Sequence, residues 1–206
     1  MSSKDRILAR IRRAASGPDG EIPRDYLRVH GSPTPAESTD LLAAHLTEYR
    51  AHVHRTGEDG LPALLARLLA PHRSVLVPPA LPPHWLSAAH PARIHDRAAS
   101  TPAELDRTGA VVTGCALAVA ETGTIVLDGG PDQGRRRITL IPDHHVCVVR
   151  VPGQVVDSVP QALARLDPAR PLTWISGPSA TSDIELDRVE GVHGPRTLDV
   201  ILLDAP

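Results

Sequence analysis

Residues 174–185 read WISGPSATSDIE, and this stretch indicates the fold class. Its apolar start predicts the end of a buried strand containing Trp174, and Gly177-Pro178 predicts a turn because glycine tolerates unusual dihedral angles. Ser182 and Glu185 then fit the capping box that opens a helix. A strand, a tight loop and a helix N-terminus together predict the ligand-binding edge of an open α/β sheet, where free N–H groups attract anions. The spacing matches neither the Walker loop nor the dinucleotide fingerprint, so it gives no support to ATP or NAD as a ligand.

Composition excludes several classes of protein. The chain has 206 residues, enough for one sizeable domain, and with two Trp, two Tyr and no Phe its core must be aliphatic. A formal net charge of −2 provides no basic field for nucleic acid. The two cysteines, Cys115 and Cys147, are too few for an iron–sulfur or zinc centre within this chain. The charged N-terminus and the lack of long apolar runs predict a cytoplasmic protein without a membrane span.

The sequence pattern divides the chain into an arm and a domain. The helical spacing of Ile7, Leu8 and Ile11 predicts a basic amphipathic helix over residues 3–15, followed by a stretch rich in Gly, Pro, Ser and Thr. We therefore expect residues 1–38 to form an N-terminal helix and flexible arm, and residues 39–206 to form one α/β domain. The helix can dock on its own domain or on a neighbouring subunit, and the sequence leaves both open.

Within the domain, helices alternate with short apolar strands, which is typical of a largely parallel sheet. From residue 109 onwards strands follow one another without intervening helices, which predicts antiparallel additions to that sheet. The expected helices cover residues 39–54, 58–70, 101–106 and 155–166. The expected strands cover residues 74–77, 92–95, 110–113, 116–120, 124–127, 135–140, 145–150 and 198–203.

Glu121 is the first candidate for chemistry. It lies with Thr122, Gly123 and Thr124 in a predicted turn between two apolar strands, where a carboxylate can act as a general base or a covalent nucleophile. The alternative is a turn acid that accepts hydrogen bonds from nearby backbone N–H groups.

The segment GGPDQGRRR at residues 129–137 is the second candidate. Its glycines make the loop pliable, and arginine binds a carboxylate or phosphate through paired donors. Because alternate residues of a strand face opposite ways, at most two of the three arginines can reach one ligand. The alternative is a solvated edge that deters strand-to-strand aggregation.

Histidines supply the third candidate. His144 and His145 are adjacent on a predicted strand and should point apart, so one of them can meet His193 at a site. The spacing does not show three convergent ligands, so we assign no metal, and metal occupancy at these histidines stays open. His193 lies between Gly191 and Gly194, which provide little packing surface, and this favours an acid–base or carboxylate-binding role.

Several motifs together resemble the LUD-domain family (DUF162), and most closely its lactate-utilisation protein C branch (LutC, YkgG-like). They occur in the family's order, from about residue 74 to the C-terminus. The motifs are TG at 113–114 leading into AVAETGTIVL at 118–127, QGRR at 133–136, LIPDHH at 140–145, ISGPSATSDIE at 175–185 and GVHGPR at 191–196.

The resemblance implies a three-layer α/β/α domain with a mixed, mainly parallel sheet, similar to the NagB/RpiA/CoA-transferase-like superfold, behind an N-terminal helical arm. It also implies a role in oxidising L-lactate to pyruvate as one of three proteins, of which the other two carry iron–sulfur centres. This chain lacks the ferredoxin-like cysteine region of its larger LUD relative. We therefore expect no cofactor in this chain and iron–sulfur clusters in its partners.

From the motif positions we expect Glu121 and His193 to be catalytic. The expected substrate- or anion-binding residues are Thr122, Gly123, Thr124, Arg135, Arg136, Ser176, Gly177, Ser179, Thr181, Ser182, Asp183 and Arg196. Together they suggest a non-cluster subunit that binds a small carboxylate, with self-association left open. Two alternatives remain: a stand-alone enzyme of the CoA-transferase-like superfold with Glu121 as nucleophile, and a non-catalytic ligand-sensing or assembly subunit.

Overall fold

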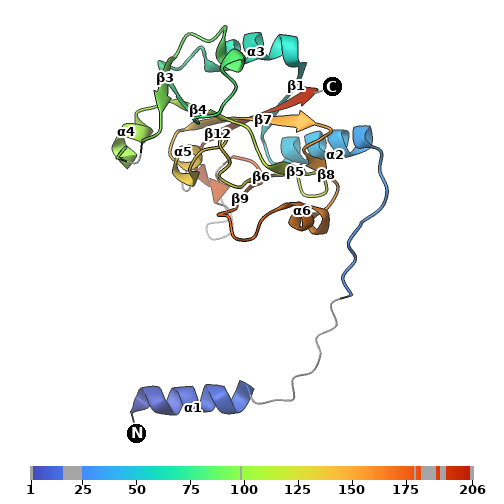
Figure 1. Cartoon of the computed structure of the whole chain (residues 1–206), viewed down its shortest axis with the longest axis vertical. Helices are drawn as coiled ribbons and strands as arrows, with labels where there is room; N and C mark the ends of the chain where they lie inside the picture. Colours follow the sequence, from blue (N-terminus) through green and yellow to red (C-terminus); the bar gives the residue numbers. More distant parts are fainter. Residues whose placement is uncertain are drawn as a thin grey trace.

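The computed structural model describes residues 2–15, 25–97, 99–178, 180–181, 189–190 and 194–204. Its centre is a six-stranded sheet in the order β1-β12-β7-β4-β2-β3, whose neighbouring strands are all parallel. The expected α/β fold with a mainly parallel sheet is confirmed (Figure 1). The strands are β1 (His52–Gly57), β2 (Ser74–Val77), β3 (Ala92–His95), β4 (Ala110–Thr113), β7 (His144–Val151) and β12 (Thr197–Asp204).

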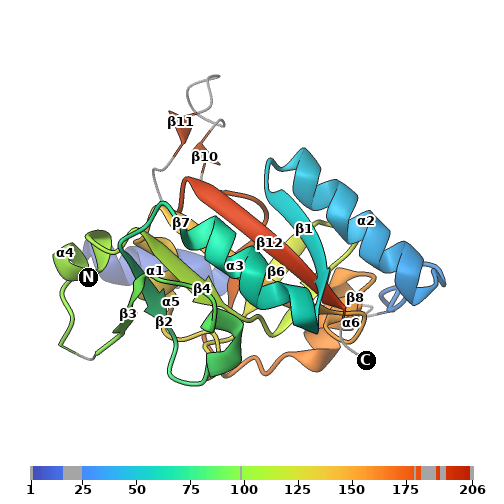
Figure 2. The same cartoon turned by 90° about the horizontal axis from the view of Figure 1, so that it is seen from above.

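A second sheet of four strands lies against one face of the first (Figures 1 and 2). Its order is β8-β5-β6-β9, with antiparallel β5–β6 and β6–β9 pairs and a parallel β5–β8 pair. We expected these strands to extend the parallel sheet, but they form a layer of their own, in which β5 and β6 are buried on both faces. The strands are β5 (Leu117–Val119), β6 (Thr124–Leu127), β8 (Val155–Val156) and β9 (Thr173–Ile175).

Helices cover the outer faces of the two sheets (Figure 2). On one face of the central sheet, α3 (Leu61–Leu69) and the 3-10 turn η2 (Pro83–Leu86) pack against β2, β4, β7 and β12. On the other face lie α2 (Pro35–Glu48) and the second sheet. The helix α6 (Val159–Arg165) covers the far side of the second sheet. The core is therefore layered and mainly aliphatic, as the scarcity of aromatic residues predicts, with Trp85 as a fully buried exception.

The boundary between α2 and β1 differs from the prediction. The helix begins at Pro35 because Thr34 and Glu37 form a capping box and proline is preorganised for the first helical turn. It ends at Glu48, the chain reverses at Arg50, whose φ is 67°, and β1 follows. Residues 52–54, which we expected on the helix, therefore lie on a strand.

The expected capped helix is confirmed as α4 (Pro102–Asp106). Two other segments depart from the expected pattern. Residues 136–140 form a short helix, α5 (Arg136–Leu140), instead of a strand, because Ile138 anchors one side of the turn in a small buried cluster. The helix expected from residue 155 starts only at Val159, after β8, where Ser158 and Gln161 form a capping box.

The segment after β9 also differs from the expectation of a helix. The short strands β10 (Ala180–Thr181) and β11 (Val189–Glu190) pair antiparallel, so the chain is a strand again at Val189. Residues 182–188, where the helix was expected to begin, lie outside the described residues.

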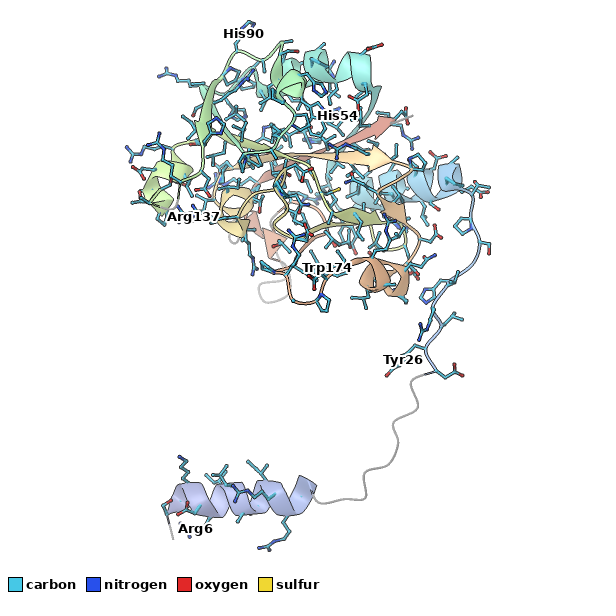
Figure 3. All side chains as sticks on the ribbon, in the orientation of Figure 1. Arg6, Tyr26, His54, His90, Arg137 and Trp174 are labelled. Atoms are coloured by element: carbon cyan, nitrogen blue, oxygen red, sulfur yellow. The ribbon has the colours of Figure 1, made fainter. Side chains whose placement is uncertain are left out.

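The amphipathic helix expected at the N-terminus is present as α1 (Ser3–Ala15). Its apolar side chains are open to solvent, with Ile7 59% and Ile11 56% exposed. Figure 3 shows Arg6 and its neighbours on α1 with no other described element against them. None of the helices in the described part of the chain is long and apolar enough to cross a membrane.

Candidate functional site

A cavity of about 300 Å³ lies between the two sheets, at the amino ends of β7 and β12. His145 and Leu198 are register partners on these two strands, and both line the cavity. Residues 173–178, from β9 and the turn after it, also line it. The stretch that indicated the fold therefore borders a cavity, although at the amino edge of the parallel strands. The other lining residues are Arg136, Thr139, Leu140, Gly194 and Pro195.

Arg136 is a cationic side chain that lines this cavity and has no ion-pair partner among the described residues. Its neighbour Arg135 is committed to Asp96 through two hydrogen bonds, of 2.6 and 2.7 Å, which raise the pKa of Arg135. Arg137 donates to the carbonyl oxygen of Ser100. Among the described residues Arg136 has no ion-pair partner, and it lines the cavity from the first turn of α5. Of the two arginines expected to bind an anion, the structure therefore offers Arg136 and not Arg135.

His145 places a neutral imidazole in the same cavity. The side chain is 1% exposed, and its Nε2 lies 2.8 Å from the hydroxyl of Thr113, which is fully buried. Burial, and to a lesser extent the charge of neighbouring His144, lowers the pKa of His145 to about 3. The ring therefore stays uncharged at neutral pH and offers one donor and one acceptor nitrogen.

A chain of hydroxyl groups connects three of the predicted residues. The Ser176 hydroxyl is 2.7 Å from the Thr124 hydroxyl, which is 2.8 Å from the Thr122 hydroxyl. Ser176 lines the cavity, so these contacts fix its position through the second sheet. The structure therefore brings these three residues together, and their role in binding an anion stays a prediction.

Two glycines make close approaches that a side chain would prevent. Gly177 has a φ of 90°, and a Cβ added there would lie 2.5 Å from the carbonyl oxygen of Tyr49. Gly123 has a φ of 56° and forms the expected turn, where a Cβ would lie 2.7 Å from the Cβ of His45. Both glycines thus hold a loop of the second sheet against α2 or the turn that follows it.

Glu121 lies away from the cavity. Its carboxylate is 46% exposed and faces Nδ1 of His30, which is 3.1 Å from both of its oxygens. This contact attaches the extended arm to the turn between β5 and β6. The surroundings are those of a solvent-exposed hydrogen bond and not the apolar walls that would prepare a carboxylate for nucleophilic attack.

The remaining predicted residues are only partly placed. Arg196 lies 3.5 Å from Asp143, and both side chains are largely exposed. Thr181 belongs to β10, and its side chain is not described. The other predicted residues, Ser179, Ser182, Asp183 and His193, lie outside the described residues.

Trp174 is exposed, contrary to the expectation of a buried strand end. Its neighbour Ile175 pairs with Ile125 and packs towards the central sheet, so strand alternation turns the indole outward. The Trp174 side chain is 39% exposed, and Figure 3 labels it near the outer surface of the second sheet. Trp174 therefore does not give the cavity a buried aromatic wall.

A cluster that the sequence analysis did not identify lies on the opposite face of the central sheet. His144 and His145 point to opposite faces, as expected of adjacent strand residues. Nε2 of His144 lies 2.6 Å from Asp199, and its Nδ1 lies 2.9 Å from Nε2 of His72. Nε2 of His54 lies 2.5 Å from the other oxygen of Asp199. Nδ1 of His52 lies 3.7 Å from Asp199 as well. The alternation of His52 and His54 is therefore the sequence signal for this cluster, but it can be recognised only when the segment is known to be a strand.

Burial and hydrogen bonding shift the pKa values of two members of this second cluster. Burial alone would raise the pKa of Asp199, but the hydrogen bonds from His144 and His54 outweigh it and lower the pKa. Burial, together with His144, lowers the pKa of His72. Within the described ranges, no group of three or more His, Cys, Asp or Glu side chains has the arrangement needed to hold a metal ion.

Comparison with known proteins identifies close relatives. The model of the LUD domain matches residues 83–203. The chain is similar to lactate utilization protein C of Deinococcus radiodurans, with 43% identity over 98% of this chain and 95% of that protein. Lactate utilization protein C of Bacillus subtilis is 35% identical over 45% of this chain and 41% of that protein. A crystal structure of a DUF162 family protein from Deinococcus radiodurans superposes with a TM-score of 0.71 at 40% identity, covering 84% of this chain and 99% of that one.

Proposed function

The chain belongs to the LUD-domain family, and from this premise we propose that it acts in lactate utilisation as the non-cluster subunit of a system that oxidises L-lactate to pyruvate. The relatives named lactate utilization protein C support the metabolic role, because one of them matches this chain along almost its whole length. The partners would be iron–sulfur proteins of the same system, since this chain has two cysteines and both are buried.

The observation that supports a ligand role is the unpaired Arg136 on the cavity between the sheets. Arginine binds a carboxylate through two parallel N–H donors, and the imidazole of His145 adds no second positive charge. Apolar side chains from Leu140, Ile175 and Leu198 line the same cavity. A single cation beside apolar walls suits a small monoanion such as lactate or pyruvate.

Oxidation of L-lactate to pyruvate removes two electrons and two protons from the carbon and oxygen of the secondary alcohol. In the proposed system the iron–sulfur clusters of the partner proteins would accept the electrons and pass them to an added dye in an assay, and the two protons would go to the solvent. The role of this chain is to bind the carboxylate and fix its orientation, which lowers the entropic cost of bringing the alcohol to the electron acceptor.

The proposal is tested by lactate-dependent dye reduction with this chain, its two presumed partners and each combination with one protein omitted. We expect turnover to require this chain and to fall at least about tenfold with Arg136→Gln, because a charge-assisted hydrogen-bond pair to the carboxylate is lost. Arg67→Gln is the matched control, since Arg67 is an exposed arginine on α3, across the central sheet from the cavity.

Two outcomes would change the assignment. Full activity of the partners alone would overturn the role as a working subunit and would favour a sensing or assembly role. Equal activity of Arg136→Gln and the control would leave the chain in the complex but overturn the cavity as the carboxylate site.

A further inference from the structure

We propose that His145 determines the specificity of the cavity by hydrogen-bonding the 2-oxygen of a 2-hydroxy acid whose carboxylate is held by Arg136. This inference rests on the proposed function, because it takes the cavity as the carboxylate site. It adds a reason for the cavity to distinguish a 2-hydroxy acid from a simple carboxylate of the same length.

The geometry leaves one ring nitrogen of His145 for a ligand. Nε2 is occupied by the Thr113 hydroxyl at 2.8 Å, and both side chains are buried, so the ring orientation is fixed. A neutral imidazole has one donor and one acceptor nitrogen, so Nδ1 takes the role opposite to that of Nε2. Among the described residues Nδ1 has no hydrogen-bond partner and is not one of the fully buried atoms left without a partner, so we infer that it faces the cavity that His145 lines.

Two hydroxyl groups of the cavity lining already have hydrogen-bond partners. The Thr139 hydroxyl donates to the carbonyl oxygen of Arg136, and the Ser176 hydroxyl is bonded to Thr124. Among the polar side chains of the described lining, His145 is the one that a buried partner holds in a fixed orientation and that keeps an unused ring nitrogen.

A hydroxyl group suits Nδ1 in either tautomer because it can both donate and accept a hydrogen bond. A methylene group in the same place would leave the buried nitrogen without a partner and would lose binding free energy. Sites built around a hydroxyl reject the analogue that lacks it for this reason. We therefore expect L-lactate to bind about tenfold more tightly than propionate, which has the same chain length and charge.

The test is calorimetric titration of the full chain with L-lactate and with propionate, repeated on two variants of His145. His145→Asn places a polar atom near the position of Nδ1 but cannot reach Thr113. His145→Gln can reach Thr113 but has no polar atom at the Nδ1 position. Unfolding curves for both variants show whether each chain is folded under the conditions of the titration.

A ligand role for Nδ1 predicts that the preference for lactate survives in His145→Asn and disappears in His145→Gln. A purely structural role for the Thr113 contact predicts the reverse, and this result would overturn the inference. Equal binding of lactate and propionate to the wild-type chain would also overturn the inference about His145. In that case, weaker binding of both acids by Arg136→Gln would still support the cavity as the carboxylate site. If neither acid binds, the carboxylate site and the inference are both rejected.

Discussion

Replacing His145 with Gln should remove part of the sensitivity of the fold to acid. Burial, with a smaller contribution from His144, lowers the pKa of His145 from 6.5 to about 3 in the folded chain. A histidine with a lowered folded-state pKa binds fewer protons when folded than when unfolded. Its stabilising contribution is therefore complete above pH 6.5 and is lost as the pH falls towards 3.

The size of the effect follows from this window. One pH unit corresponds to about 1.4 kcal/mol for a single proton, so between pH 6.5 and about pH 5 the residue should withdraw about 2 kcal/mol from the free energy of unfolding. Burial also lowers the pKa of His72, but His72 is present in both chains and its contribution cancels in the difference.

The assay is urea unfolding followed by far-UV circular dichroism at about pH 7.5 and about pH 5. His145→Gln keeps a polar atom within reach of Thr113, which limits the structural damage at neutral pH. The control is His90→Gln, which removes an exposed imidazole. If the wild-type chain and His145→Gln lose the same free energy on acidification, His145 accepts a proton equally well in both states, and the argument from burial is refuted.

Two further substitutions test the packing around the sheets. Gly177→Ala should lower the free energy of unfolding by about 1–3 kcal/mol, because a left-handed φ of 90° is combined with a Cβ only 2.5 Å from the Tyr49 carbonyl oxygen; an unchanged urea midpoint would contradict the close approach. Asp199→Asn should cost about 2 kcal/mol near pH 7, because the amide offers one acceptor oxygen where His144 and His54 require two. Thermal unfolding measures this loss, and a melting temperature within about a degree of wild type would contradict the proposed hydrogen bonds.

The parts of the fold that follow from local patterns were predictable from sequence. The strand β7 follows from a run of apolar residues, and its alternation correctly separated His144 from His145. The helix α4 follows from the cap formed by Thr101 and Glu104. In both cases the signal lies within a few residues of the element that it specifies.

Errors arose where distant contacts decide the local conformation. Residues 136–140 carry β-branched Ile138 and Thr139, which favour a strand, but burial of Ile138 against α4 and the central sheet selects a helical turn. The α2–β1 boundary depends on a reversal at Arg50, a residue type that gives no turn signal.

The candidate site was predictable in its segments but not in its pairings. The motifs pointed to Arg136 and Ser176, and the structure places both on one cavity. Sequence could not show that Arg135 is bound by Asp96, because those residues are brought together by the packing of α5 beside the end of β3. The availability of a charged side chain depends on such partners, and these come from segments remote in sequence.

The order of strands in the central sheet has a consequence for how the chain can fold during synthesis. β12 lies between β1 and β7, so these two strands, which both precede it in the chain, do not pair with each other. Until residues 197–204 have emerged, β1 lacks the strand with which it pairs. The two core clusters that include side chains of β12 also remain incomplete. Nascent chains should therefore need protection by a chaperone up to this point, and truncation before Thr197 should yield an aggregating product and not a smaller folded domain.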